Sequence, residues 1–265
     1  MRAFVEGVGL IGPGLSGWQA GRALLAGERT YSPAPTAVAA STLLPAAERR
    51  RAGVPVKLAL AAGLEAIEGA GRDAANLATV FASSSGDCEN VHAMCESLAT
   101  PERQVSPTRF HNSVHNAAAG YWSIATQCRA PSTSLCCHDS SFAAGLLDAA
   151  SQVAIDGNPV ALIAYDHPYP APLGLARPIG ATFGAALVLA PQASSAAIAL
   201  LEIEFEPQKA GPTRMDHPDL EALRTGVPAA RCLPLLAALA RSTGEPVILE
   251  YVAGTHLRMT VTRCA

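Results

Sequence analysis

Between positions 136 and 141 the sequence gathers several side chains that acyl-transfer chemistry uses. This run reads Cys136, Cys137, His138, Asp139, Ser140 and Ser141. A cysteine thiolate forms thioesters, while a carboxylate serves as a proton acceptor or as the cap of a helix. An apolar strand-like run precedes these residues and an alanine-rich helical run follows them. The cluster is therefore predicted to lie where a strand turns into a helix.

The predicted turn gives these residues different roles. Cys136 and Cys137 end the strand, where side chains alternate between faces, and a buried free cysteine acts mainly as a small hydrophobe. Ser140 and Ser141 fall in the first turn of the helix, where serines usually satisfy backbone groups. Asp139 stands at the helix N-terminus, where its charge suits the helix dipole and its oxygens can cap the helix.

Three histidines near this cluster raise the alternative of a metal site. They are His111, His115 and His138, and the first two have i, i+4 spacing. No carboxylate accompanies them on a shared helix face, and the seven cysteines include no C-x-x-C pair. We therefore expect neither a bound metal nor an organic cofactor.

Composition argues against several classes of function. Of the 265 residues, 49% are hydrophobic and 15% are charged, which suits a large core and argues against long disorder. The net charge of −3 gives no support for nucleic-acid binding. No run approaches the ~20 apolar residues of a membrane span. The first residues read as a strand rather than a signal peptide, so we expect a cytoplasmic protein with its cysteines as free thiols.

Strand-like runs alternate with helical patterns up to residue 190, which predicts an α/β fold. The predicted strands are Phe4–Ile11, Leu77–Ala82, Ser132–Cys137, Pro159–Tyr165 and Ala181–Ala190. The predicted helices are Trp18–Leu25, Val56–Ala70, Ser113–Thr126 and Ser140–Ile155, with a further helix through Leu98 that Asp87 or Asn90 would cap. Residues 32–45, with three prolines, are predicted to form a surface loop.

The pattern changes after Pro191. A strand is expected at Ala197–Phe205, and a helical region at 217–243 is expected to break near Gly226 and Pro228. A β-hairpin is expected at Pro246–Thr262, with its turn at Ala253 and Gly254. No linker separates residues 1–191 from residues 192–265, so we expect one continuous body.

The segment from Asn116 to Ser141 carries a resemblance to a known family. Its matching positions are Asn116, Ala119, Gly120, Arg129, Pro131 and Ser132. The segment resembles the β-ketoacyl synthases of the thiolase-like superfamily, where an Asn-x-x-Ala-Gly helix leads through Arg-Gly-Pro-Ser to a strand ending Thr-Ala-Cys-Ser-Ser. In this ungapped register Cys137 falls on the threonine, His138 on the alanine and Asp139 on the nucleophilic cysteine. Several motifs in one order are more specific than any one of them.

Two finer likenesses point to a subfamily. Two segments are similar to the short "β-ketoacyl synthase-like, N-terminal domain" proteins: Leu43-Leu44-Pro45 with Glu48-Arg49-Arg50-Arg51, and the run from His138 to Gly145. Those are encoded beside aryl polyene synthases and act as chain-length-factor-like partners of a complete ketosynthase. The resemblance implies a thiolase-like layered fold of the α/β/α/β/α type, with a complete first half (1–191) and a truncated second half (192–265).

The resemblance also implies which chemistry is missing. A condensing enzyme stores its acyl chain as a thioester, which the carboxylate of Asp139 cannot form. Such an enzyme carries two further histidines, one in a His-Gly-Thr motif, whereas His217 and His256 of this tail lack those neighbours. We expect a non-condensing subunit. The alternative is an acyltransferase or decarboxylase acting on malonyl- or acyl-carrier protein.

The partners follow from the same resemblance. The expected partner is a complete β-ketoacyl synthase, with acyl carrier protein as a second candidate and a homodimer when the chain is isolated. In related chain-length factors the residues before the Asn-x-x-Ala-Gly helix reach the floor of the partner's tunnel. Here the tunnel and partner residues are Phe110, His111, Asn112 and Asn116. The arginine run Arg49, Arg50 and Arg51 is either a solvated helix start or a contact for the carrier protein or a subunit.

Overall fold

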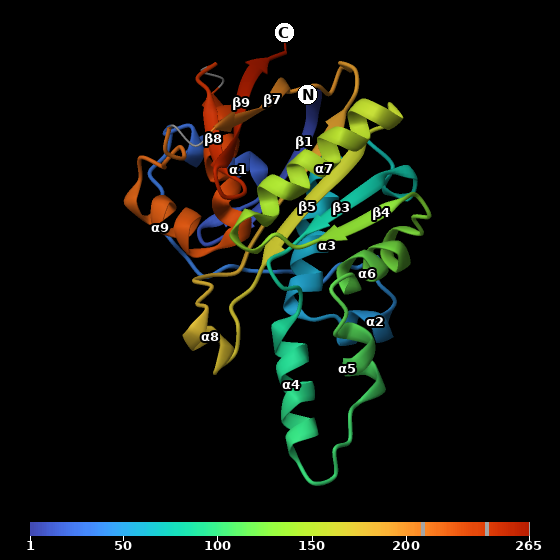
Figure 1. Cartoon of the computed structure of the whole chain (residues 1–265). Coiled ribbons are helices and arrows are strands. Elements are labelled where there is room, and N and C mark those ends of the chain that lie inside the picture. The colour runs from blue at the N-terminus through green and yellow to red at the C-terminus, as the bar shows by residue number, and fades with distance from the viewer. Residues whose placement is uncertain (208–209, 242–243, 265) are drawn as a thin grey trace.

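One sheet runs through the whole chain, which the computed structural model describes at residues 1–207, 210–241 and 244–264 (Figure 1). The strands are β1 (Arg2–Gly12), β2 (Leu15–Ser16), β3 (Ala78–Ala82), β4 (Ser132–Leu135), β5 (Val160–Asp166), β6 (Phe183–Ala190), β7 (Ala199–Pro207), β8 (Val247–Glu250) and β9 (Thr255–Arg263). The α-helices are α1 (Trp18–Leu25), α2 (Ala46–Arg51), α3 (Val54–Gly69), α4 (Cys88–Ala99), α5 (Pro107–Asn112), α6 (Ala117–Thr126), α7 (Ser141–Asp156), α8 (Leu173–Ala176), α9 (Pro218–Gly226) and α10 (Leu233–Arg241). Short 3₁₀ helices lie at Ala74–Asn76, His138–Ser140 and Pro228–Cys232.

The sheet is mixed. Among the described residues its nine strands follow the order β4-β3-β5-β6-β1-β7-β9-β8, with β2 paired to β1. Strands β4, β3 and β5 are parallel, and every other pairing is antiparallel. All residues of β5 and β6 are buried, because helices cover both faces of the sheet at its centre. The near-continuous apolar sequences of these two strands are typical of strands buried on both faces.

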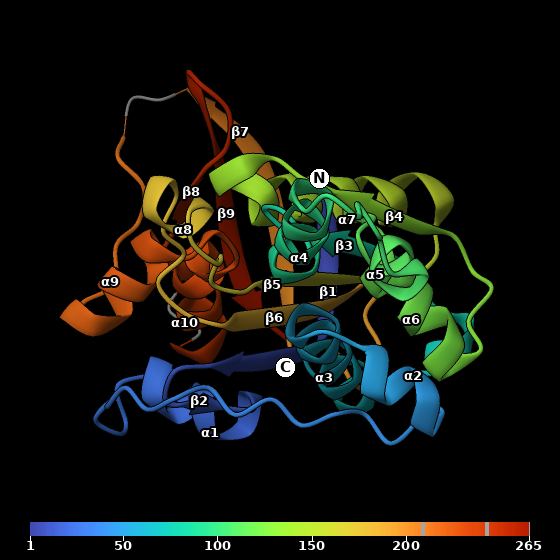
Figure 2. The same cartoon turned by 90° about the horizontal axis from the view of Figure 1, so that it is seen from below.

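Helices cover the two faces of this sheet. Figure 2 shows α3 on one face of β5 and β6 and α7 on the other. The core beneath α3 and α6 includes Phe81, Ile163 and Val188, and the core beneath α7 and α10 includes Leu162 and Leu187. The backbone of α3 approaches β1 so closely that a Cβ on Gly7 or Gly9 would overlap carbonyl oxygens of α3. Glycine is therefore required at these two positions of β1.

The C-terminal segment, from residue 192 onwards, continues the sheet instead of forming a separate one. Strand β7 pairs with β1 through Ala199–Glu202, and β9 and β8 follow it. The inner faces of β7 and β9 join the same core as α7, with Leu201, Ile203 and Met259 buried there. The fold class is as expected for a thiolase-like protein, whereas the division at residue 191 stays a prediction.

Most expected elements lie where the sequence places them, with two informative differences. The strand predicted at Ser132–Cys137 ends at Leu135, because its last bond to β3 is from the Ser83 N–H to the Leu135 carbonyl. The helix predicted at Ser113–Thr126 begins at Ala117, after a turn. In the C-terminal part α9 ends at Gly226, as expected, and α10 spans Leu233–Arg241. The last two residues of the predicted range 217–243 lie outside the described residues.

Among the helices in the described part of the chain, none has the length and apolar content needed to cross a bilayer.

Candidate functional site

The turn between β4 and α7 carries the side chains singled out from the sequence. It forms a 3₁₀ helix at His138–Ser140, and α7 starts at Ser141. His138 has a φ of 51°, in the left-handed region that a non-glycine residue rarely adopts. Backbone conformations of this kind concentrate at functional sites. Asp139 thus lies at the N-terminal end of α7, as expected, but it lies in the turn that precedes the helix.

The carboxylate of Asp139 is held between two arginines. Its Oδ1 lies 2.9 Å from Nη2 of Arg177, and its Oδ2 lies 3.1 Å from Nη2 of Arg231. Arg231 also pairs with Glu250 of β8. The prediction that Asp139 caps α7 is wrong, because its carboxylate oxygens are engaged in these ion pairs. A backbone N–H of the turn, that of Cys137, is bound instead by the Ser141 hydroxyl, which accepts its hydrogen bond at 3.0 Å.

Both arginines come from segments remote in sequence. Arg177 follows α8, and its Nη2 also donates to the Ser84 hydroxyl at 2.8 Å. Burial, the largest single effect, would lower the pKa of Arg177, but its hydrogen bonds to Asp139 and Tyr169 and the charges of these two groups together raise the pKa. Burial lowers the pKa of Arg231, although the charge of Asp139 opposes that shift. Both guanidinium groups remain cations at neutral pH, so they neutralise the carboxylate.

The C-terminal hairpin of β8 and β9 also contacts this turn and one of its arginines. The Ser140 hydroxyl donates to the Tyr251 carbonyl, and Glu250 holds Arg231 as described. Asp139 itself keeps 40% of its side chain exposed. A carboxylate paired with two cations is a weak nucleophile, since its lone pairs are directed at the guanidinium N–H groups. The geometry suits a structural ion-pair cluster at the position where the sequence register expects a nucleophile.

A buried carboxylate that the sequence did not single out links the same region together. Asp166, at the end of β5, accepts hydrogen bonds from the N–H groups of Ser84 and Ala229, both at 2.8 Å. The Ser83 hydroxyl lies 3.2 Å from it. Burial raises the pKa of Asp166 to about 7, against these hydrogen bonds. Because Ala229 lies two residues before Arg231, Asp166 fixes the 3₁₀ segment that delivers Arg231 to Asp139.

Replacing Asp166 with asparagine is expected to lower the free energy of unfolding at pH 6 by about 1–3 kcal/mol. An amide has a single oxygen, so its NH₂ group must face a backbone N–H of Ser84 or Ala229. Urea unfolding of both proteins at several pH values measures the loss.

The same comparison tests the titration of Asp166. Its pKa is raised from 3.8 to about 7 in the folded state, so the folded protein holds a proton that the unfolded chain releases. The advantage of the native chain over Asp166→Asn is therefore greatest below about pH 4 and declines until the pH passes about 7. A difference that stayed constant between pH 4 and pH 8 would contradict the raised pKa.

His138 belongs to the Asp139 cluster, with its Nδ1 3.5 Å from Oδ1 of Asp139, whereas Cys136, His115 and His111 have other surroundings. Cys136 is exposed, and its thiol donates to the Ser84 carbonyl. His115 contacts the Ser83 carbonyl at 3.1 Å, while His111 is exposed on α5. Within the described residues, no three histidine, cysteine or acidic side chains are grouped as metal ligands would be.

The two tail histidines are also engaged elsewhere. His217 caps α9 by accepting the Asp219 N–H at 3.3 Å. His256 is buried on β9, where its Nδ1 lies 3.1 Å from the Ala210 carbonyl. Both contacts are structural, and they fit the expectation that neither residue belongs to a His-Gly-Thr motif.

The predicted partner residues lie on and beside α5, which with α4 forms a hairpin that projects from the body (Figures 1 and 2). Phe110 is 66% exposed, and His111 and Asn116 are exposed near it. Asn112 is instead buried, where its amide donates to the Arg51 carbonyl and accepts from the Tyr121 hydroxyl. Asn112 therefore ties α2 and α6 to α5, whereas Phe110 projects freely.

An open concavity lies between α6 and the edge of β4. It is lined by His115, Asn116, Ala119, Gly120, Ser123, Ser132 and Ser134. Small and polar side chains form its walls, and a Cβ added to Gly120 would meet no neighbouring residue within 4 Å. The concavity thus has room for side chains from another molecule.

The arginine run lies on α2, next to α5. Arg51 pairs with Glu48 at 3.0 Å, and Arg49 donates to the Leu44 carbonyl at 3.3 Å. Arg50 is exposed. Arg49 and Arg51 are thus engaged within α2 and its entry, whereas the side chain of Arg50 lies on the surface.

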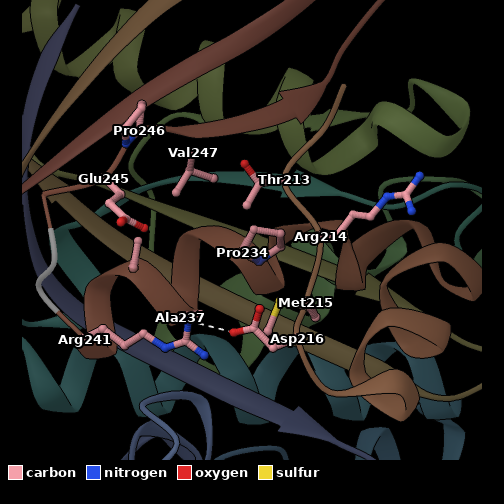
Figure 3. Close-up of a pocket in the computed structure, with 11 residues that line it drawn as sticks. Thr213, Arg214, Met215, Asp216, Pro234, Ala237, Arg241, Glu245, Pro246 and Val247 are labelled. Carbon is pink, nitrogen blue, oxygen red and sulfur yellow. Dashed lines mark ion pairs between the residues drawn. The ribbon is translucent and has the colours of Figure 1, made fainter. Parts of the chain in front are cut away.

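A small cavity of about 70 Å³ lies in the tail, between α10, β8 and the segment 213–216 (Figure 3). Asp216 and Arg241 form an ion pair at its edge, at 3.1 Å. Its volume fits a few water molecules, whereas acyl ligands require several hundred Å³. This cavity is therefore a packing feature beside the edge of β8.

The layered sheet, the helix α7 at its centre and the strand-turn-helix around Asp139 define a thiolase-like protein of the ketosynthase class. The chain belongs to the family described as "Beta-ketoacyl synthase, N-terminal domain", whose model matches residues 18–231. The resemblance found in the sequence is thereby confirmed. A direct comparison with curated proteins finds no match.

Solved structures share this fold over nearly the whole chain. A chain of the complex of a ketosynthase with its chain length factor from Xenorhabdus doucetiae is 19% identical, with a TM-score of 0.75, and the match covers 98% of this chain and 99% of that one. A β-ketoacyl synthase from Burkholderia phymatum is 15% identical, with a TM-score of 0.73 and full coverage of both chains. A chain of the ishigamide ketosynthase/chain length factor is 15% identical, with a TM-score of 0.70, again with full coverage. The predicted fold class is confirmed by these likenesses.

Proposed function

We propose that this chain is a non-condensing, chain-length-factor-like subunit that pairs with a complete β-ketoacyl synthase in the synthesis of a polyketide-like chain. One observation carries the proposal: Asp139 occupies the register of the nucleophile and is neutralised by Arg177 and Arg231. A thioester cannot form on this side chain. The fold shared with chains of ketosynthase and chain length factor complexes supports the same role.

The two edges of the sheet support pairing through β4. At the β8 edge, Thr213 donates its N–H to the Ile248 carbonyl and its hydroxyl accepts the Ile248 N–H, so the segment around it covers that edge. At the other edge, β4 carries no charged side chain and is followed by no further strand of the described chain. Proteins normally protect such edges with charges, prolines or a covering segment. An open β4 favours a partner that adds its own strand.

The register of β4 identifies the groups that face such a partner. The carbonyls of Pro131 and Leu135 accept hydrogen bonds from the N–H groups of β3 and of Ser83 just after it. Since alternate residues of a strand face the same neighbour, the backbone groups of Ser132 and Ser134 face the open edge. The concavity beside α6 lies at this edge and would receive side chains of the partner.

In this arrangement Phe110 is the residue that limits the length of the product. An aromatic side chain that is mostly exposed on a projecting hairpin is available to close the partner's tunnel. Co-expression of Phe110→Ala with a complete ketosynthase from the same gene neighbourhood is expected to give products longer by at least one extension unit. Mass spectrometry of the products measures this, and unchanged lengths would remove the tunnel role while leaving the pairing intact.

Acyl carrier protein is the second proposed partner, with the α2 arginines as its contact. Carrier proteins are acidic, and a rim charge mainly speeds association. Arg50→Glu is expected to slow association with the carrier protein several-fold, most clearly at low salt. Arg263→Glu, at the exposed C-terminal end of β9, is the matched control. Equal rates for the two variants would assign the arginine run to the solvated surface.

An aryl polyene pathway is the setting that the finer sequence likeness favours, through Leu43-Leu44-Pro45 and the run after His138.

The proposed non-condensing role is tested by incubating the purified chain with acyl- and malonyl-carrier protein. Intact-mass spectrometry is expected to show no acyl adduct, and no carbon dioxide should be released. An adduct on Cys136 or Cys137, or steady decarboxylation, would favour the acyltransferase or decarboxylase alternative.

A further inference from the structure

An apolar groove lies between α7 and the C-terminal strands, on the far side of α7 from β4. It has a volume of about 360 Å³ and is lined by Met1, Leu147, Ile203, Glu204, Phe205 and Leu257. Phe205 is 60% exposed, and its ring contacts Tyr251 at a centroid distance of 6.4 Å. A large exposed aromatic side chain beside an apolar hollow is typical of a protein contact.

Helix α7 lies between the groove and the open edge of the sheet. Ser151 of α7 contacts the Met1 sulfur at 3.4 Å, and its neighbour Gln152 donates to the Thr133 hydroxyl of β4 at 3.4 Å. One helix, about 10 Å wide, therefore separates the groove from β4. Figure 1 shows α7 in front of the sheet, between β4 and the strands β8 and β9, with no other described element in front of it.

The outward face of α7 is itself apolar in part. Leu147 is half-buried at the groove, and Ile155, two turns further along the helix, is 82% exposed. Residues spaced by three or four along a helix form one stripe. Helix α7, which follows the nucleophile register, thus leaves Leu147 partly and Ile155 largely exposed, with Ser151 between them on the same face.

The size of a stable interface favours one occupant for this surface. Specific protein interfaces bury roughly 1,200–2,000 Å² in total, and obligate ones bury more. The β4 edge has four residues and cannot supply such an area by itself, even with the concavity beside α6. A partner paired to β4 must therefore extend over the helices on either side of the strand, and on one side that helix is α7.

We infer that the ketosynthase partner covers α7 as well as the β4 edge, and that it places an apolar side chain in the groove beside Phe205. This inference rests on the proposed pairing with a ketosynthase, and it adds a second contact that the β4 edge does not require. The contact then extends from Thr133, which Gln152 contacts, over α7 to Leu147 and Phe205. The groove stays open on its outer side, because β7 and β9 flank α7 without covering it.

Site-specific photo-crosslinking tests this contact directly. Leu147→benzoylphenylalanine is irradiated in the complex with the ketosynthase, and Leu175→benzoylphenylalanine is the control. Leu175 is 84% exposed on α8, which Figure 1 shows well away from α7. We expect a crosslink to the ketosynthase from position 147 and none from position 175. Leu147→Arg should also weaken the complex about 30-fold, as a central contact does.

The outcomes separate this inference from the proposed function. A complex that forms without a crosslink from position 147, and that tolerates Leu147→Arg, would remove the α7 contact and leave the pairing through β4. A crosslink to a second copy of this chain or to the carrier protein would replace the ketosynthase as the occupant. Failure of the native chain to bind a ketosynthase at all would remove the proposed function and the inference with it.

Discussion

The Ser134→Pro chain is expected to fold normally and to lose its ketosynthase partner. Ser134 directs its backbone N–H towards the open edge of β4, since the carbonyls of Pro131 and Leu135 face β3 and residues alternate along the strand. Proline removes that N–H and places its ring where a partner strand would approach. The β3 side of the strand keeps its hydrogen bonds, so the substitution acts on the edge. We expect affinity for the ketosynthase to fall by ~100-fold, enough to lose the complex in gel filtration.

A matched pair of variants makes this result interpretable. Ser134→Ala removes the hydroxyl but keeps the N–H, and it should co-purify with the ketosynthase as the native chain does. Thermal melting should give similar midpoints for both variants, because neither touches the bonds between β4 and β3. If Ser134→Pro bound the ketosynthase as tightly as Ser134→Ala, pairing through the β4 edge would be excluded.

The sequence predicted the class of this fold from local patterns. Alternating apolar runs located the central strands, and Gly226 with Pro228 located the break between α9 and α10. The ungapped motif from Asn116 to Ser132 placed Asp139 at the turn before α7. These features depend on residues close together in the chain, so hydrophobic period, breakers and motif spacing are sufficient to find them.

The two arginines that pair with Asp139 could not be predicted from local sequence patterns. Arg177 lies 38 residues from Asp139 along the chain and Arg231 lies 92 residues from it, so no local pattern joins them. Asp166 was missed for a related reason, because at the end of a strand it resembles an ordinary turn residue. Its hydrogen bonds to Ser84 and Ala229 depend on tertiary packing.

The wrong expectation that Asp139 caps α7 has the same origin. Residue type and position favoured a cap, since aspartate before an apolar helix commonly serves that purpose. Two arginines at hydrogen-bonding distance compete for the same oxygens, and charge-assisted pairs are stronger than a cap. Ser141 then takes over the hydrogen bond from the turn. The local sequence therefore predicted the position of Asp139 correctly, whereas arginines from distant parts of the chain determine what its carboxylate binds.

The Asp139→Cys chain is expected to gain a reactive thiol without gaining condensing activity. The introduced sulfur would lie at the N-terminus of α7, beside the guanidinium groups of Arg177 and Arg231. Positive charges and a helix N-terminus lower the pKa of a thiol below its usual value of about 8.5. At pH 7 we expect iodoacetamide to alkylate it roughly tenfold faster than the exposed Cys95, as peptide mapping by mass spectrometry can measure.

Arg177→Ala in the Asp139→Cys background is the control, and it should slow the alkylation because one cation is removed. Condensation should stay absent, since His217 caps α9 and His256 is bound to the Ala210 carbonyl, which leaves neither to assist decarboxylation. An alkylation rate no higher than that of Cys95 would show that the two arginines do not surround this position in solution. Extension of an acyl group by malonyl-carrier protein on the Asp139→Cys chain would go further. It would mean that the remaining catalytic groups are present, and that the loss of the cysteine alone silences an otherwise complete enzyme.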